Sequence, residues 1–459
     1  MRIYNLEAYS GKEYVTPQMY GAKGDGVTDD TLALQSAIDN TKGLPVHIPN
    51  GVYMVSKLVL KDYVKIVGAS QEGVVLKGNS NSAILYGGDY DVNATGSDNP
   101  TVLGLQCCEI SDLTVDGNKT AKNGIAIYGI NNVLKDVTVK NCTGIGIATE
   151  SPNGIHSLDV NLQYTMMNIT AFDNGEGNIY YNGQSDSNLF NILCYRPNKN
   201  ISGCYNIRFG RKSNGSRIFG LHVWGEADYG IKNEGVRCCF TNCHAETGKI
   251  AQVYSNTTIT FKGHLYLNGV TNDSCGVHLD GASNSIIDAT FSQLKTFVKI
   301  TGSGSRNMYN LLGYTNNYDD PKIFDGTPST TDKVYATMWG TVNQTIEKNP
   351  YIDASPTANK YYSEGSFQFF RKGNGTPTFG LELHEGTTNY IAMVGHGAGA
   401  IGGTITTRGN NTDSDIAISP KGNGRLRFGT YEAKSDASIT GFITIKDKNG
   451  TERKLAVIG

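Results

Sequence analysis

This sequence has fewer charged and hydrophobic residues than an ordinary globular protein. Charged residues make up only 18% of its 459 residues and hydrophobic residues only 38%, while proline (12) and tryptophan (2) are scarce. No apolar run is long enough to cross a membrane, and the first residues lack the apolar core of a secretory signal. The net charge of −2 provides no basic field for nucleic acid. We therefore expect no membrane insertion and no nucleic-acid partner.

The nine cysteines also lack the spacing of a metal site. Two pairs are directly adjacent rather than of the CxxC type, and other cysteines fall within apolar strand patterns, as at Cys142, Cys194 and Cys243. We interpret them as buried free thiols in a protein that folds in the cytosol, with disulfides as the alternative.

What the sequence does contain is typical of many short strands joined by tight turns. Glycine is abundant (56), and tyrosine (26) outnumbers phenylalanine (15). Such a composition favours an all-β fold whose surface carries polar aromatic rings.

Near the start, residues 20–30 read YGAKGDGVTDD, and a helical stripe of Leu32, Leu34, Ala37 and Ile38 follows. Thr28 or Asp29 can cap that helix, and acidic side chains suit its positive end. We interpret the three aspartates of the motif as turn and cap residues. The loop lacks the GxxxxGKS/T pattern of a phosphate cradle, so no cofactor is expected.

This motif, the helix after it and the run IPNGVY at residues 48–53 closely resemble the N-terminal segment of the pectate-lyase-like superfamily, which includes phage tailspike depolymerases. The resemblance implies a right-handed parallel β-helix whose N-terminal end is plugged by the helix. It does not identify the reaction, because the superfamily also holds polygalacturonase-type hydrolases and some epimerases.

The middle of the chain repeats a seven-residue pattern that is apolar at its first, fourth and sixth positions. Successive copies are 22 to 32 residues apart, a spacing typical of a β-solenoid. The copies are residues 110–116, 134–140, 166–172, 189–195, 218–224 and 240–246, with weaker ones at 286–292 and 308–314. We expect the repeat to end after Tyr314.

The seventh position of each copy is expected to point outward, so that these residues form one column: Asp116, Lys140, Phe172, Tyr195, Trp224, Glu246, Ser292 and Tyr314. Phe172, Tyr195 and Trp224 then lie one above another at about 4.8 Å per coil. Sugars stack on such rings, so this aromatic strip is a predicted substrate-binding surface. The alternative is a stabilising ladder buried under a loop or in a subunit contact.

A second strand recurs between the copies and predicts a neighbouring outer column of Ala126, Gly146, Tyr180, Arg208, Lys232 and His278. Its basic centre suits a polysaccharide that carries carboxylates, so Tyr180, Arg208 and Lys232 are further candidates for substrate binding. Ordinary solvated surface is the alternative.

Acidic residues occupy the bends between the two strands. Glycoside hydrolysis needs two carboxyl groups, and neighbouring coils bring Glu226 or Asp228 within range of Glu246 or Asp173. Trp224 can raise the pKa of one acid by desolvation, and His222 can hold the substrate or tune the pair. Turn roles are the alternative for each acid.

His222 and His244 share a column one coil apart. No third ligand with metal spacing is recognised, so no metal site is predicted.

We divide the chain into an N-terminal segment and cap (residues 1–75), a parallel β-helix with the polysaccharide site (76–344) and a C-terminal β-rich module for trimerisation or carbohydrate binding (345–459). The strand-like segments of the last part are residues 415–429, 441–447 and 453–458. The likeness to tailspikes implies a homotrimer that associates with other phage tail proteins. It also implies a chain made in the bacterial cytoplasm and located in the virion.

The function expected from these features is binding and depolymerisation of a bacterial capsular or O-antigen polysaccharide, by glycosidic hydrolysis. A lyase or epimerase acting on uronic-acid polymers and a non-catalytic receptor-binding spike remain as alternatives.

Overall fold

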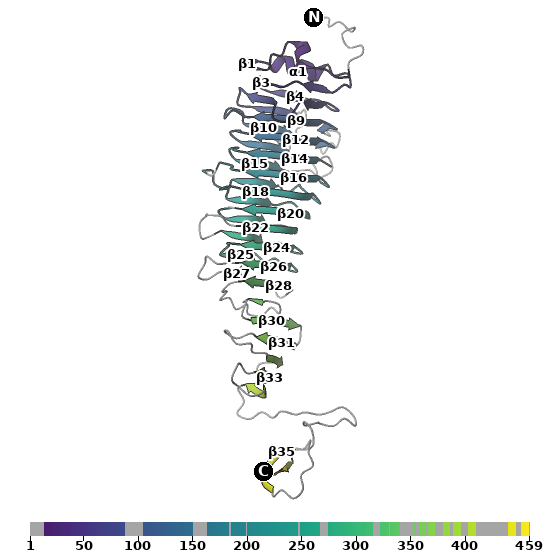
Figure 1. Cartoon of the computed structure of the whole chain (residues 1–459). Helices are drawn as coiled ribbons and strands as arrows, with labels where there is room; N and C mark the ends of the chain where they lie inside the picture. The colour runs from purple at the N-terminus through teal and green to yellow at the C-terminus, as the bar shows by residue number, and fades with distance from the viewer. Residues whose placement is uncertain are drawn as a thin grey trace.

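A parallel β-helix forms most of the computed structural model, as a column of coils that runs from the N-terminus downwards (Figure 1). The structure describes residues 13–87, 104–149, 163–182, 185–198, 200–246, 248–266, 274–314, 322–329 and 331–339, and beyond them only the C-terminal strands and Thr451. Among these residues, no helix is long and apolar enough to cross a membrane.

Two sheets make up the walls of the column. The larger has 16 strands: β1 (Asp25–Asp29), β2 (Val46–Ile48), β3 (Gly51–Val55), β5 (Lys65–Gly68), β6 (Val74–Gly78), β9 (Glu109–Asp116), β12 (Val133–Lys140), β14 (Thr165–Phe172), β16 (Asn188–Tyr195), β18 (Arg217–Trp224), β20 (Cys238–Glu246), β22 (Ile259–Tyr266), β24 (Ile286–Ser292), β26 (Met308–Tyr314), β28 (Lys333–Trp339) and β29 (Asp353–Ala354).

The smaller sheet has 11 strands: β4 (Leu58–Leu60), β7 (Ala83–Gly87), β10 (Asn123–Ile127), β13 (Ile145–Thr149), β15 (Gly177–Tyr181), β17 (Tyr205–Phe209), β19 (Tyr229–Asn233), β21 (Ala251–Ser255), β23 (Cys275–Asp280), β25 (Thr296–Thr301) and β27 (Lys322–Asp325). A small parallel pair, β8 (Leu105–Gln106) and β11 (Gly129–Ile130), lies beside them.

The register of the larger sheet confirms the predicted repeat. Leu134 pairs with Ile110 on one side and with Met166 on the other, and the pairing continues through the following coils. The first, fourth and sixth side chains of each seven-residue copy between residues 110 and 246 are buried and form the core. A fully buried aliphatic side chain contributes about 1.5–3 kcal/mol, so each coil is held by its contacts with the coils above and below.

A left-handed residue at the third position explains why the apolar pattern is 1-4-6 instead of strictly alternating. Asp112, Asp136, Asn168, Asn191 and Asn242 all have φ between 52° and 57°. Short polar side chains tolerate this conformation better than other residues with a Cβ atom. The bend moves the inward face by one residue, and the side chains bond from coil to coil, as Asn168 Nδ2 does to Asp136 Oδ1 at 2.7 Å.

The coil containing β21 and β22 lacks this extra residue and was missed in the sequence. The register shifts between Thr241 and Cys243, so that Gly263 pairs with Cys243. In the two strands that follow, Ile287 and Tyr309 are therefore the first inward residues, where the sequence pattern predicted their neighbours Ile286 and Met308.

The expected end of the repeat after Tyr314 was also wrong. β27 and β28 add a further coil, in which Val334 and Ala336 are buried. At the other end, strands such as β1 and β3 already join the sheets before residue 76.

The N-terminal helix α1 (Thr31–Asp39) lies at the end of the column, next to the 3-10 turn η2 (Pro17–Tyr20). Leu34, Ala37 and Ile38 are buried as predicted, but Leu32 is 82% exposed and does not belong to the stripe. Leu32 lies two residues from the buried Leu34, which is about 200° around the helix, and therefore points to the opposite side.

The aspartates of the motif have the structural roles expected for them. Asp30, rather than Thr28 or Asp29, is the N-cap residue, and its carboxylate accepts the Lys23 and Gly24 N–H groups. Asp29 accepts the N–H of Thr31. Hydrogen bonds from the N–H groups of Thr28 and Val27 lower the pKa of Asp25 to about 2.

All nine cysteines are free thiols and seven of them are buried, in agreement with the sequence interpretation. Burial raises the pKa of Cys142 to about 12, which makes its thiol unreactive.

The C-terminal strands pair in antiparallel fashion: β30 (Ala358–Ser363) with β31 (Ser366–Arg371), β33 (Asn389–Gly395) with β32 (Gly380–Glu385) and β34 (Gly403–Gly409), and β35 (Ile439–Lys446) with β36 (Glu452–Ile458). The last pair confirms the two strand-like segments predicted at residues 441–447 and 453–458. The predicted segment 415–429 lies outside the described residues.

Buried asparagines fix the turns that follow the larger sheet. Asn178 is fully buried, and its amide donates to the carbonyl of Tyr195 at 3.0 Å and to Asn206 Oδ1 at 3.0 Å. Asn206 in turn donates to the carbonyl of Trp224 at 3.2 Å. These amides hold the backbone of two residues of the aromatic strip.

We predict that Asn178→Ala lowers the free energy of unfolding by about 1–3 kcal/mol, because it leaves buried polar partners unsatisfied. Denaturant unfolding measures the change. Asn310→Ala, which removes an exposed amide bonded to Asp288, is the matched control and should cost less than about 0.5 kcal/mol. Equal effects of the two substitutions would contradict this role of the buried amides.

Candidate functional site

The predicted aromatic strip is present on the outer face of the larger sheet. The rings of Phe172 and Tyr195 stack with centroids 4.7 Å apart, and those of Tyr195 and Trp224 are 4.8 Å apart, with planes within 6° of parallel. All three side chains are half-buried. Tyr266, from the coil missed in the sequence, extends the same column beyond Glu246. The side chain of Tyr314 lies outside the described residues.

A charged side chain, Arg196, lies against part of this strip. The guanidinium of Arg196 lies 5.0 Å from the centre of the Tyr195 ring and 5.7 Å from that of Phe172. Arg196 also makes a two-bond ion pair with Asp173, with both N–O distances at 3.0 Å. The strip is therefore both a stabilising ladder and a partly open surface, and Trp224 lies at its less covered end.

The four predicted acids have different surroundings. Asp173 is a turn residue with φ of 56° and is paired with Arg196. Asp228 accepts the N–H of Gly203 from the preceding coil, which holds a turn in place. Glu226 is exposed in the turn after Trp224. The carboxylate of Glu246 lies 3.0 Å from His222 Nε2 and 3.6 Å from His244 Nε2.

The sequence missed Glu246 as the partner of both histidines. His244 and Glu246 are two residues apart on β20 and therefore point to the same face, while His222 pairs with His244 across the sheet. That i, i+2 spacing was the available signal. The structure brings these three groups together.

The basic column of the smaller sheet is confirmed in its centre and corrected at two places. Tyr180 pairs with Arg208 and Arg208 with Lys232. Ala148, not Gly146, precedes Tyr180 in the column, because Ile125 pairs with Ile147 and not with Ile145. Tyr254 stands between Lys232 and His278, in the coil that the repeat analysis missed.

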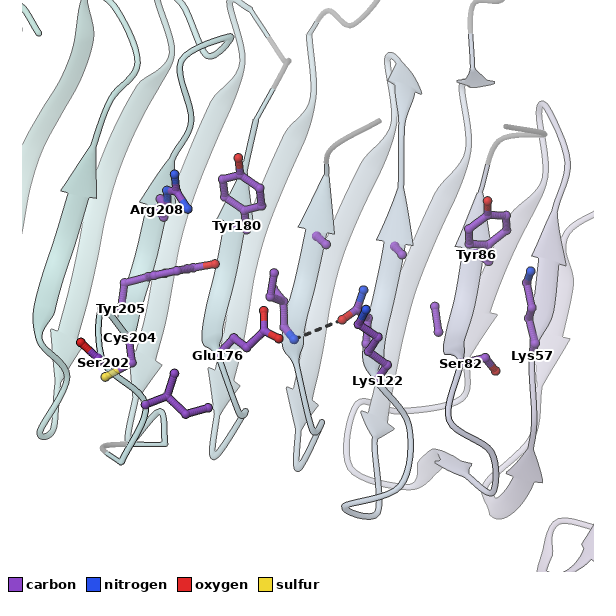
Figure 2. A pocket seen from close by; sticks show the side chains of 17 residues that line it. Lys57, Ser82, Tyr86, Lys122, Glu176, Tyr180, Ser202, Cys204, Tyr205 and Arg208 are labelled. Atoms are coloured by element: carbon purple, nitrogen blue, oxygen red, sulfur yellow. Dashed lines mark hydrogen bonds between the residues drawn. The ribbon is translucent and has the colours of Figure 1, made fainter. Parts of the chain in front are cut away.

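The part of this column from Ala126 to Arg208 forms the floor of a groove of about 750 Å³ (Figure 2). Ala126 and Ala148 are consecutive in the column, and their small side chains leave space between the larger Tyr86 and Tyr180. The groove therefore exists because two coils in succession carry alanine where their neighbours carry aromatic rings.

The lining of the groove is rich in cations and tyrosines. Lys57, Lys122 and Arg208 contribute positive charge, and Tyr86, Tyr180 and Tyr205 contribute rings. Lys57 Nζ lies 3.9 Å from the centre of the Tyr86 ring, and the Arg208 guanidinium lies 4.9 Å from that of Tyr180. Glu176 is the one carboxylate among the described lining residues.

One end of the groove is fixed by ion pairs that the sequence did not reveal. Arg208 donates to Glu234 Oε2 from both Nε, at 3.0 Å, and Nη2, at 2.7 Å. Lys232 Nζ lies 3.9 Å from the other oxygen of the same carboxylate. Burial and the neighbouring Arg208 lower the pKa of Lys232, and Glu234 opposes the shift.

Beyond Lys232 a hydrogen-bonded chain continues down the sheet. Tyr254 donates to Asp280 Oδ2 at 3.1 Å, and Thr301 donates to Asp280 Oδ1 at 2.8 Å. The Thr301 hydroxyl has no second proton, so it accepts from His278 Nε2 at 2.8 Å. His278 therefore carries a proton on Nε2.

The N-terminal part of this chain matches a known family, and the fold recurs in solved structures. Residues 18–143 match the family described as rhamnogalacturonase A/epimerase, pectate lyase-like. The full-length tailspike protein 2 of the Escherichia coli O157:H7 bacteriophage CAB120 has the same fold, with a TM-score of 0.52 at 12% identity. That alignment covers 87% of this chain and 63% of the tailspike.

The curated relatives include phage proteins and proteins of Azotobacter vinelandii. A capsule-specific depolymerase of Klebsiella phage K64-1 is 34% identical over 185 residues, which are 39% of this chain and 20% of that protein. The mannuronan C5-epimerase AlgE5 of Azotobacter vinelandii is 29% identical over 265 residues, which are 48% of this chain and 25% of that protein. The chain thus spans a quarter or less of the length of these relatives.

We predict that the fold loses stability as the pH falls through about 6.5. Burial lowers the pKa of His244, His264 and His278, so these rings stay neutral in the folded chain at pH values where they are protonated in the unfolded chain. The unfolded state then binds more protons, and the free energy of unfolding decreases with decreasing pH.

Denaturant unfolding between about pH 7.5 and pH 5 measures this dependence. His278→Gln, which keeps a hydrogen-bond donor towards Thr301, should make the profile less steep. A wild-type profile that is flat over this range would contradict the prediction.

Proposed function

Starting from a pectate-lyase-like β-helix related to phage tailspikes, we propose that this chain binds and depolymerises an anionic bacterial surface polysaccharide in the groove of the smaller sheet. The observation that carries the proposal is the composition of that groove, with three cations and three tyrosines around a floor of two alanines. Cations pair with the carboxylates of an acidic sugar, and tyrosine rings stack on its C–H faces.

Within this function, the groove favours β-elimination over hydrolysis. Hydrolysis needs two carboxyl groups, whereas Glu176 is the single carboxylate that the described lining residues supply. Elimination from a uronate needs cations that neutralise the sugar carboxylate, and a base that removes the proton beside it. Arg208 and Lys122 fit the first task, and Tyr180 or Tyr205, as the phenolate, fits the second.

The bonds of the elimination balance within the substrate. The C5–H bond breaks, a double bond forms between C4 and C5, and the C4–O glycosidic bond breaks. The leaving oxygen takes up a proton from an enzyme acid, for which Glu176 or a tyrosine is available in the groove. If the C4–O bond instead stays intact and an acid on the opposite face delivers a proton to C5, the outcome is epimerisation.

Glycosidic hydrolysis on the larger sheet is the second candidate. Glu246 follows Trp224 in the outer column, and Glu226 and Asp228 lie in the turn that joins β18 to β19. These acids are the catalytic residues predicted from the sequence, and the aromatic strip is the predicted binding surface. Against this reading, Asp173 is held by Arg196 and Asp228 by a backbone N–H group.

A location in the phage tail, a homotrimeric assembly and contacts with other tail proteins belong to the same proposal. The tailspike fold and the phage depolymerase relative support this setting.

We predict that Ala148→Trp abolishes depolymerisation, because the indole fills the floor of the groove between Tyr86 and Tyr180. The assay follows acidic capsular polysaccharides and alginate by ultraviolet absorbance and by oligosaccharide mass. Elimination gives an absorbing double bond, whereas hydrolysis gives products heavier by one water and without new absorbance.

Thr290→Trp, on the outer face of β24, is the control for activity. Ala289→Trp places the same ring at a core position and is compared only by its melting temperature. Full activity of Ala148→Trp would remove the groove as the site. Hydrolytic products that disappear in Glu246→Gln would favour the larger sheet.

We predict that Trp224→Ala weakens polysaccharide binding about tenfold but changes the melting temperature little, since the ring is half-buried on the outer face and lies at the end of the aromatic stack. Affinity electrophoresis in gels containing the polysaccharide measures binding. Phe219→Ala, at an exposed ring on the same strand, is the matched control and should leave binding unchanged. Unchanged binding of Trp224→Ala would leave the strip a purely structural ladder.

A further inference from the structure

Three histidines form a column on the outer face of the larger sheet, away from the groove. His222 on β18 pairs with His244 on β20, and His244 pairs with His264 on β22. The first two rings are parallel, with centroids 4.7 Å apart and planes within 4°. The third ring is turned by 64° relative to His244. The first two histidines are thus arranged alike and the third is not.

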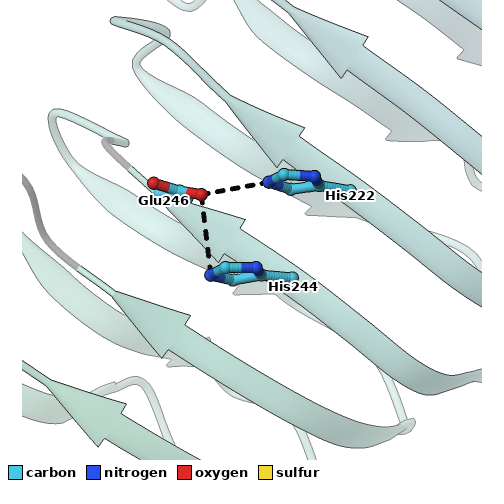
Figure 3. Close-up of side chains that lie close together, drawn as sticks. All are labelled: His222, His244 and Glu246. Carbon is cyan, nitrogen blue, oxygen red and sulfur yellow. Dashed lines mark hydrogen bonds and ion pairs between the residues drawn. The ribbon is translucent and has the colours of Figure 1, made fainter.

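Glu246 joins the two parallel rings at one oxygen atom (Figure 3). Its Oε1 lies 3.0 Å from His222 Nε2 and 3.6 Å from His244 Nε2. The donor atoms of the three side chains all lie within 4.8 Å of one another. The two measured distances are close to the roughly 3.4 Å edge of a tetrahedron with metal–ligand bonds of about 2.1 Å. Because a metal lies in the plane of the imidazole that binds it, the two parallel rings must turn towards each other to share one ion.

One nitrogen of this group is left without a hydrogen bond. His244 Nε2 is buried and has no hydrogen-bond partner among the described residues. An unsatisfied buried polar atom costs about 1–3 kcal/mol, so a native structure normally gives it a partner.

His264 has other partners and does not belong to the group. Its Nδ1 lies within hydrogen-bond distance of Thr290 Oγ1, and its Nε2 lies 3.5 Å from Ser292 Oγ. Two histidines and one glutamate therefore remain as potential ligands. Their side chains are 42%, 40% and 21% exposed, so a fourth coordination position can face solvent.

We propose that His222, His244 and Glu246 form a binding site for a divalent transition metal, best matched by Zn²⁺. Two imidazoles and one carboxylate with an open fourth position are a ligand set that zinc accepts. Hard cations such as Ca²⁺ and Mg²⁺ prefer six or more oxygen ligands and are not served by this group. The metal links β18 to β20 and gives His244 Nε2 a bond in place of the long 3.6 Å contact with Glu246.

The proposal is independent of the groove, because its residues lie on the other sheet and its readout is metal binding. Protein stripped of metal with EDTA and dialysed is titrated with ZnCl₂ by calorimetry at pH 7.5. We expect one equivalent of Zn²⁺ per chain, a melting temperature that rises with Zn²⁺, and no comparable binding of Ca²⁺ or Mg²⁺. Co²⁺ should give the visible absorption bands of a low-coordinate site.

Single substitutions test the assignment of ligands. His244→Ala and Glu246→Gln should each weaken Zn²⁺ binding at least about tenfold and remove most of the rise in melting temperature. His264→Ala, in the next coil of the same column, is the matched control and should bind Zn²⁺ like the wild type. Circular dichroism and cooperative unfolding establish that each variant is folded. If His244→Ala does not fold, Glu246→Gln alone tests the ligand assignment, because it keeps the shape of the side chain.

Three results would overturn the proposal. They are the absence of stoichiometric Zn²⁺ binding to the wild type, equal binding by Glu246→Gln, and equal affinity for Ca²⁺ and Zn²⁺.

Discussion

The parallel register between successive coils is the constraint on which everything else in this protein depends. Because each strand pairs in the same phase with the strand one coil away, any side chain that points outward lies about 4.8 Å from its counterpart above and below. Residues that are 22 to 32 positions apart in the sequence become neighbours in this way. The left-handed residues at the bends keep that phase, since they fix where the inward face changes.

The sequence was sufficient where the repeat is complete. The 1-4-6 pattern located the strands from β9 to β20, and it placed Phe172, Tyr195 and Trp224 in one stack. It failed at β22, because that strand has lost the bend residue and so no longer shows the seven-residue pattern. It also failed at β13, where both Ile145 and Ile147 fit the apolar frame and only the pairing decides between them.

The candidate groove was harder to predict, because it arises from the absence of large side chains at two positions of the column. Tyr180, Arg208 and Lys232 were recognised as a column, but a cavity depends on Ala126 and Ala148 being small next to Tyr86. The ion pairs of Glu234 and the meeting of His222 with Glu246 depend on rotamers and on diagonal contacts between coils. A repeat pattern gives the position of a residue along the wall and not the direction in which a long side chain extends.

The layout of the groove argues for a polymer rather than a single sugar as its ligand. Its lining begins beside β4 and extends to β17, and these strands are five steps apart in the smaller sheet. At about 4.8 Å per step this is a length of roughly 24 Å, which one monosaccharide cannot span. Lys57 lies at one end and Arg208 at the other, so only a chain with charges on several units pairs with both. On the proposed function, a linear polyanion would follow the axial repeat of the β-helix, whereas a small anionic ligand would contact only a few of these cations and rings.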